Sequence, residues 1–141
     1  MAETRNIDVF ISYAHGDEPW ASEFVNELKA QGVRTWWDHD IALGERLTES
    51  MEEALREAPI LAVLVTPNYI SNSSSAFELG AAVAGNKKII PIVRQKEQQH
   101  MLPRFLRDWQ PLQESSPKIA GKHVAQVVEN LPQFGVTGKV F

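Results

Sequence analysis

The run Ile60-Leu61-Ala62-Val63-Leu64-Val65 decides the fold, because it is apolar throughout and has the length of one β-strand. A strand with no polar residue on either face is typical of the interior of a parallel sheet, where helices cover both faces. Thr66-Pro67-Asn68 follows at once and predicts the end of the strand. The run therefore indicates an α/β domain with a buried sheet.

Strand-like and helix-like stretches alternate on both sides of this run. Further strands are expected at 7–11, 33–37 and 89–93, with a weak fifth near 109–112; helices are expected between Asp17 and Gly32, at 48–58, 74–85 and 101–108, and from Pro117 onward. This order predicts right-handed crossovers and a parallel sheet of about five strands. The 141 residues fit one domain, expected over 1–131, followed by a loose C-terminal tail at 132–141.

Three residues carry specific structural expectations. Asp17 is expected to cap the first helix, which carries Pro19 in its first turn, and Gly32 is expected to end that helix. Pro91 lacks an N–H, so the strand at 89–93 is expected either at a sheet edge or with that position facing away from a neighbour.

Composition and charge exclude several classes of protein. The net charge is −4 and no block of five or more basic residues occurs, so nucleic acid is not expected as a partner. The absence of cysteine excludes disulfides, thiol catalysis and cysteine-ligated zinc. No signal-peptide pattern and no membrane-length apolar run occur, so we expect a cytoplasmic protein without a membrane partner.

Several common active-site patterns are missing. The chain has no G-x-G-x-x-G, no P-loop and no G-x-S-x-G motif, and Thr66 stands where a phospho-receiver domain would need an aspartate. The four histidines do not pair at metal-ligand spacing, and Asp38-His39-Asp40 is interpreted as a solvated loop, so no metal site is predicted. Ligands of such sheets bind outside the carboxyl ends of the strands, which here are followed by the loops after Ile11, Trp37, Val65 and Val93.

Four segments, taken together, resemble the Toll/interleukin receptor (TIR) domain. They are the strand and exit at 8–13, Asp17 with its helix, the loop at 37–45, and the stretch 71–79 followed by the strand at 88–92. The resemblance covers about residues 6–131 and implies a flavodoxin-like three-layer sandwich. It also implies one of two functions, since some TIR domains are adaptors whereas many bacterial and plant members cleave NAD.

In the NAD-cleaving members a glutamate of the third helix is essential, and the matching residue here is Glu78. Breaking the nicotinamide–ribose bond builds positive charge on the sugar, which a carboxylate can stabilise. Nicotinamide departs neutral from a cationic ring, so no second acid is needed. We therefore expect an NAD glycohydrolase or ADP-ribosyl cyclase that gives nicotinamide and ADP-ribose or a cyclic isomer, with NAD as substrate and no cofactor.

The expected substrate-binding residues lie at the ligand end of the sheet: Ser12, Tyr13, Trp37, Asp38, Gly44, Ser71 and Ser75. Many enzymatic members carry an aromatic residue where this chain has Ser74, so a stacking ring is expected from Tyr13, Trp37 or Tyr69 instead. Trp36 and Trp37 are adjacent in a strand and are expected to face opposite sides. The loop at 38–47 is expected to gate the site.

Other interpretations remain open at this point. Ser75-Ala76-Phe77-Glu78 is also a capping box, in which Glu78 needs no catalytic role. One alternative is a non-catalytic TIR adaptor that assembles with other TIR domains; another is a nucleoside deoxyribosyltransferase with a nucleophilic glutamate. The resemblance further implies self-association through TIR surfaces, a sensor domain or protein as partner, and a role in defence signalling.

Overall fold

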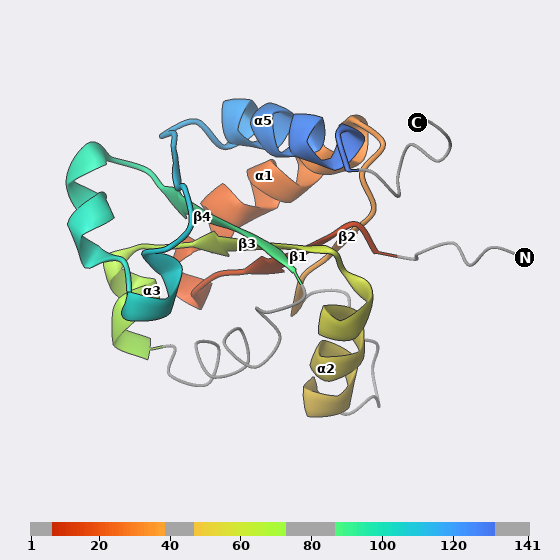
Figure 1. Ribbon diagram of the computed structural model, residues 1–141, viewed down its shortest axis with the longest axis horizontal. Coiled ribbons are helices and arrows are strands. Elements are labelled where there is room, and N and C mark those ends of the chain that lie inside the picture. The colour runs from red at the N-terminus through yellow and green to blue at the C-terminus, as the bar shows by residue number, and fades with distance from the viewer. Residues whose placement is uncertain (1–6, 39–46, 73–86, 132–141) are drawn as a thin grey trace, which may run out of the picture.

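A five-stranded parallel sheet forms the centre of the molecule, with the strand order β2-β1-β3-β4-β5 (Figure 1). The computed structural model describes residues 7–38, 47–72 and 87–131. The strands are β1 (Val9–Ser12), β2 (Thr35–Trp36), β3 (Ile60–Leu64), β4 (Lys88–Val93) and β5 (Leu112–Gln113). This is the strand order of the flavodoxin-like α/β fold, so the predicted fold class is confirmed.

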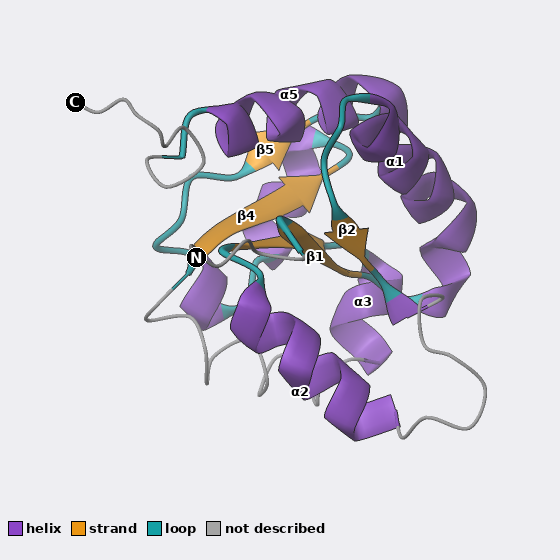
Figure 2. Ribbon diagram, turned by 90° about the vertical axis from the view of Figure 1, so that its right-hand side faces the viewer, coloured by secondary structure: helices purple, strands orange, loops and turns teal. Residues whose placement is uncertain are grey.

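Helices cover both faces of the sheet (Figure 2). They are α1 (Glu18–Ala30), α2 (Leu47–Glu57), α3 (Pro67–Asn72) and α5 (Pro117–Glu129), with 3-10 turns η1 (His15–Asp17), η4 (Lys96–Met101) and η5 (Arg104–Leu106). Both views place α1 and α5 on one face, with α2 and α3 on the other (Figures 1 and 2). None of these described helices has the length and apolar character needed to cross a bilayer.

Strand β3 is buried along its whole length, as its sequence predicts. Ile60, Ala62 and Leu64 pack in the core shared with α1 and α5, whereas Leu61 and Val63 pack in the core shared with α2 and α3. Successive side chains of a strand point to opposite faces, so an apolar run is required when both faces are covered. The central strand thus joins the two cores.

Helix α1 ends as its sequence predicts. Gly32 has φ 86, a left-handed conformation that glycine adopts without strain. The amide of Val33 donates to the carbonyl of Leu28, and the amide of Gly32 donates to that of Lys29. These two bonds form a Schellman motif, which turns the chain from α1 into β2.

Pro91 does not lie in an edge strand, because β4 is paired on both sides, with β3 and with β5. The carbonyl of Ile92 accepts from Val65 beside β3, and that of Val93 accepts from Glu114 beside β5. Since alternate residues face opposite neighbours, the nitrogen of Pro91 faces β5, whose pairing begins only at Ile92. The edge expectation is therefore wrong. The nitrogen of Pro91 is on the β5 side but precedes the first residue paired with β5, so the missing N–H removes no hydrogen bond between the two strands.

Two helical segments differ from the sequence-based expectation. Helix α3 begins at Pro67, where a loop is expected, because Thr66 accepts the amide of Tyr69 through its Oγ1 and so caps the helix. The expected helix at 101–108 is replaced by the 3-10 turns η4 and η5. The expected helix at 74–85 lies outside the described residues, as does the tail at 132–141.

Candidate functional site

The carboxyl ends of β1 and β2 bring together three predicted site residues: Tyr13, Trp37 and Asp38. The Tyr13 hydroxyl donates a hydrogen bond of 2.5 Å to Oδ1 of Asp38. The rings of Tyr13 and Trp37 lie 5.7 Å apart between centroids, with an interplanar angle of 41°. Because β1 and β2 are parallel neighbours, their exits leave the same edge of the sheet. All three side chains are partly exposed there.

The surroundings of Tyr13 keep its hydroxyl protonated. Partial burial, and then the hydrogen bond and charge of Asp38, raise the pKa of the Tyr13 hydroxyl well above its ordinary value. Tyr13 is therefore a neutral donor at any physiological pH. Oδ2 of Asp38 lies 3.6 Å from Nε2 of the exposed His15. The Asp38 carboxylate thus has the Tyr13 hydroxyl at one oxygen and the His15 ring near the other.

The two adjacent tryptophans face opposite sides, as predicted. Trp36 stacks on Phe10, with centroids 4.8 Å apart and an interplanar angle of 17°, and packs against the core on the α2 side. Trp37 packs against the core on the α1 side, beside Tyr13. The ring of Trp37 is thus the one that borders the cluster with Asp38.

The side chains of Ser12 and Tyr69 connect the end of β1 to α3. The hydroxyls of Ser12 and Tyr69 are hydrogen-bonded at 2.7 Å, joining the end of β1 to α3. Tyr69 is only 2% exposed, whereas Tyr13 and Trp37 are half-buried. Of the three rings expected to stack on a ligand, Tyr13 and Trp37 therefore reach the surface.

Burial of Tyr69 makes alkaline stability depend on its hydroxyl. Burial raises the pKa of Tyr69 to about 12, against an opposing effect of the bond with Ser12. The folded protein therefore holds this proton more tightly than the unfolded chain. The resulting stability, roughly 2–3 kcal/mol, is complete below the unfolded pKa of about 10 and is lost as pH rises to about 12.

As the pH rises from about 10 to about 12, we expect the stability of the Tyr69→Phe variant to fall less than that of the wild type. Phenylalanine has no proton to release. Urea unfolding at intervals from pH 9 to 12 measures the effect. Other titrating groups are common to both proteins and cancel in the difference. Parallel stability curves for the two proteins would show that Tyr69 does not titrate with a raised pKa.

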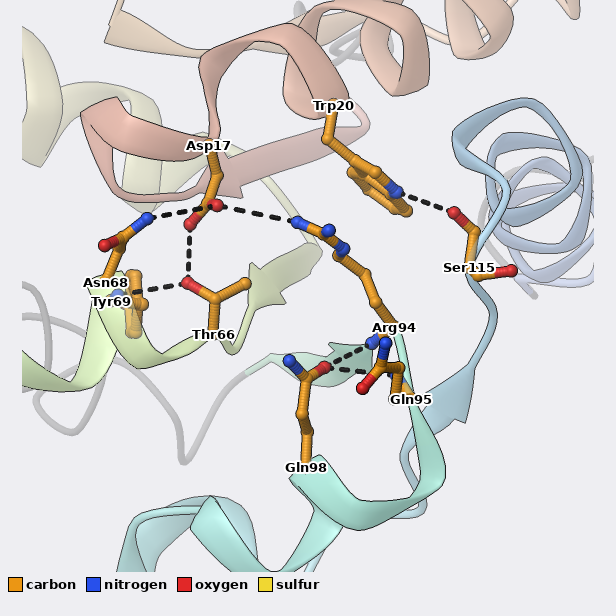
Figure 3. A network of polar contacts seen from close by, with 9 residues as sticks. All are labelled: Asp17, Trp20, Thr66, Asn68, Tyr69, Arg94, Gln95, Gln98 and Ser115. Atoms are coloured by element: carbon orange, nitrogen blue, oxygen red, sulfur yellow. Dashed lines mark hydrogen bonds and ion pairs between the residues drawn. The ribbon is translucent and has the colours of Figure 1, made fainter.

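Asp17 does not cap α1 with its side chain, so that expectation is wrong. The residue occupies the N-cap position, but its carboxylate makes no capping hydrogen bond. Oδ2 accepts the Thr66 hydroxyl at 2.5 Å, while Oδ1 lies 3.4 Å from Nδ2 of Asn68 and 3.6 Å from Nη1 of Arg94 (Figure 3). The carboxylate thus joins the exits of β1, β3 and β4. Thr66, Asn68 and Arg94 were not predicted, and only their positions just after strands pointed to them.

Of the remaining predicted site residues, the structure places only Ser71. Gly44, Ser75 and Glu78 lie outside the described residues. Ser71 lies in α3, near its carboxyl end. The described part of the site is therefore the cluster of Tyr13, Trp37 and Asp38.

The sequence profile of one family, described as "TIR domain", matches residues 9–127. The chain is similar to the 2' cyclic ADP-D-ribose synthase BtTIR of Bacteroides thetaiotaomicron, with 27% identity over 95 residues, which cover 63% of this chain and 33% of that protein. It is 30% identical over 91 residues to the 2' cyclic ADP-D-ribose synthase AbTIR of Acinetobacter baumannii, covering 60% of this chain and 34% of the relative. The NAD(+) hydrolase TcpC of Escherichia coli O6:H1 is 28% identical over 131 residues, covering 85% and 43%. The chain spans about a third to two-fifths of the length of these relatives.

Solved structures share the fold. The TIR domain of the Toll-related receptor TRR-2 from Hydra magnipapillata superposes with a TM-score of 0.72 and 22% identity, covering 90% of this chain and all of that one. The RPS4 and RRS1 TIR domain heterodimer gives a TM-score of 0.61 with 14% identity, covering 86% and 94%. The family match spans most of the described fold, including the exits of β1 and β2. The chain belongs to the TIR domain family.

Proposed function

We propose that this chain is an NAD nucleosidase, which cleaves the nicotinamide–ribose bond to give nicotinamide and ADP-ribose or a cyclic ADP-ribose isomer. The observation that carries the proposal is the cluster of Tyr13, Trp37 and Asp38 at the carboxyl ends of β1 and β2. Such ends are where sheets of this topology bind nucleotides. Relatives named as 2' cyclic ADP-D-ribose synthases and an NAD(+) hydrolase support the same substrate.

The cluster offers groups that suit the base and the ribose of a nucleotide. The rings of Tyr13 and Trp37, 5.7 Å apart, supply flat apolar surface for a base. The carboxylate of Asp38, with 32% of its side chain exposed, can accept a hydrogen bond from a ribose hydroxyl. The neutral Tyr13 hydroxyl holds Asp38 in place through the bond of 2.5 Å. Asp38 therefore serves to orient the substrate.

Glu78 supplies the chemistry in this proposal. As the nicotinamide bond lengthens, positive charge develops on the ribose ring, and a nearby carboxylate stabilises that charge more than it stabilises the ground state. Nicotinamide leaves as a neutral molecule, so the reaction needs no proton donor at the leaving group. The released ribosyl cation is then captured by water or by a nucleophile of the same molecule.

Self-association is part of the proposal. Some structural neighbours of the fold are TIR assemblies, such as the RPS4 and RRS1 heterodimer. In the proposed enzyme, the loop at 38–47 of one copy completes the site of another, through heterologous surfaces that can form open filaments. A sensor domain or protein would control that assembly in a cytoplasmic defence response.

The test is nicotinamide release measured over a wide range of wild-type protein concentration. We expect the rate per protein to rise with concentration, because the active site is completed by assembly. Chromatographic separation distinguishes ADP-ribose from a cyclic isomer. Nicotinamide release strictly proportional to protein would contradict the assembly requirement. Assembly without any loss of NAD would favour the adaptor function.

A further inference from the structure

Among the described residues, two buried aspartates are paired with arginines, at opposite ends of the sheet. Asp8 and Arg34 precede β1 and β2, and therefore lie at the amino ends of these strands. Asp17 and Arg94 follow β1 and β4, and therefore lie at the carboxyl ends. The two aspartates are 1% and 7% exposed. The pairs are alike in composition, but only the second one lies at the ligand end.

The amino-end pair joins two neighbouring strands directly. Oδ1 of Asp8 accepts from Nη2 of Arg34 at 3.2 Å, and Oδ2 accepts from Nε at 3.3 Å. Oδ2 also accepts the backbone amide of Arg34 at 3.0 Å. This bidentate pair binds the start of β2 to the start of β1.

The carboxyl-end pair holds together three chain segments that are distant in sequence. Figure 3 shows the Asp17 carboxylate between the side chains of Thr66, Asn68 and Arg94. The Thr66 hydroxyl donates to Asp17, and the same oxygen accepts the amide of Tyr69 in the first turn of α3. The position of Asp17 is therefore transmitted to the start of α3.

The backbone at Arg94 is held by hydrogen bonds that do not involve the Arg94 side chain. The backbone amides of Arg94 and Gln95 donate to Oε1 of Gln98, at 2.8 and 3.1 Å (Figure 3). The guanidinium then reaches across to Oδ1 of Asp17. The exit of β4 is thus an anchored point from which Arg94 restrains the exit of β1.

The exit of β1 is short and closely packed, so a restraint at Asp17 extends to Tyr13. The amide of Asp17 donates to the carbonyl of Ala14 at 2.8 Å, which closes the turn that follows Tyr13. A Cβ at Gly16 would lie 2.7 Å from Nδ2 of Asn68, so this turn already touches the start of α3. Little room remains for the turn to move on that side.

We propose that Asp17 and Arg94 are positioning residues for the site at the carboxyl ends of the strands. Their ion pair, with Thr66, fixes the exit of β1, which carries Tyr13, relative to the exits of β3 and β4. The inference rests on the proposed function for its catalytic consequence. Neither residue contacts the substrate; both act through the placement of Tyr13 and hence of Asp38.

The experiment compares Arg94→Gln with the matched control Arg34→Gln. Each change removes an arginine from a buried aspartate, and the two arginine side chains are similarly exposed, at 39% and 45%. Melting temperature, amide hydrogen exchange, and KM and kcat for NAD are measured for both variants. Arg94→Lys, which retains the charge, is the conservative variant.

We expect both glutamine variants to lose stability, because each leaves a buried carboxylate without its cation. Only Arg94→Gln should accelerate exchange at 13–18 and 66–72. It should also lower kcat/KM about tenfold to a hundredfold, as a small misplacement of site residues does. Arg34→Gln should keep kcat and KM within about twofold, and Arg94→Lys should restore most of the lost activity.

Other outcomes would overturn either the positioning role or the proposed function. Equal losses of kcat/KM in Arg94→Gln and Arg34→Gln would overturn the positioning role and leave only a general stability effect. If no protein, wild type included, consumes NAD, the proposed function fails, and hydrogen exchange decides the inference alone. Faster exchange confined to 13–18 and 66–72 in Arg94→Gln would then support the restraint, whereas uniform exchange changes would overturn it.

Discussion

Replacing Glu78 by glutamine is expected to lower the rate of nicotinamide release by about 10²- to 10³-fold or more. Glutamine has nearly the same shape as glutamate but no negative charge. It can still accept a hydrogen bond from a ribose hydroxyl, so binding of NAD should change less than the rate. The loss should therefore be in kcat rather than in KM, because the charge acts on the transition state.

Steady-state kinetics of Glu78→Gln and of Glu52→Gln, measured together, check this expectation. Glu52 is an exposed glutamate of α2, and its change alters the net charge by the same amount. Glu52→Gln should retain the wild-type rate. If Glu78→Gln retained it as well, Glu78 would be a capping residue in its S-x-x-E sequence, and the site assignment would be wrong.

Gly121→Val is expected to cause the largest loss of stability, roughly 3 kcal/mol, or about 6–12 °C in melting temperature. A Cβ at Gly121 would lie 2.8 and 2.9 Å from Cβ and Cγ of Glu27, and 3.3 Å from the carbonyl oxygen of Phe24. These are backbone and inner side-chain atoms of α1, which cannot swing away. Helices α1 and α5 must therefore move apart, and their shared core must open.

Thermal unfolding of Gly121→Val and Lys122→Val measures this effect. Lys122 is the next residue of α5 and is exposed, so its change carries the helix cost of a β-branched residue without the contact. Lys122→Val should shift the melting temperature far less. Valine forms helices better than glycine does, so helix propensity alone predicts no loss of stability for Gly121→Val. A melting temperature of Gly121→Val at or above that of the wild type would contradict the close packing of α1 on α5.

The fold was predictable where a local pattern determines it. The apolar run at 60–65 identifies the buried central strand, and Gly32 marks the end of α1, because each depends only on its neighbours in sequence. Helix α3 was missed because Thr66-Pro67 was interpreted as a strand stop. Threonine followed by proline also begins a helix, and the bond from Tyr69 to Thr66 shows that it does here.

The site was predictable only in part, for a physical reason. Tyr13, Trp37 and Asp38 follow strands, and parallel topology alone brings their positions to one edge. The role of Asp17 depends on tertiary partners, Thr66 and Arg94, that lie 49 and 77 residues further along the chain. Local capping preference suggested the wrong partner for this carboxylate, because no local pattern records a contact across three strands.

The two aspartate–arginine pairs lie at opposite ends of the sheet, and we expect them to have different effects on activity. The pair before β1 joins the amino ends of β1 and β2, whereas the pair after β1 joins the exits of β1 and β4. In sheets of this topology ligands bind outside the carboxyl ends of the strands. We therefore expect loss of the pair at the carboxyl end to lower activity more than loss of the pair at the amino end.

The most direct test is the incubation of concentrated wild-type protein with NAD, followed by separation of the products. The account predicts that NAD disappears and that nicotinamide forms in equal amount, with ADP-ribose or a cyclic isomer as the second product. Intact NAD in the presence of folded, self-associated protein would contradict it.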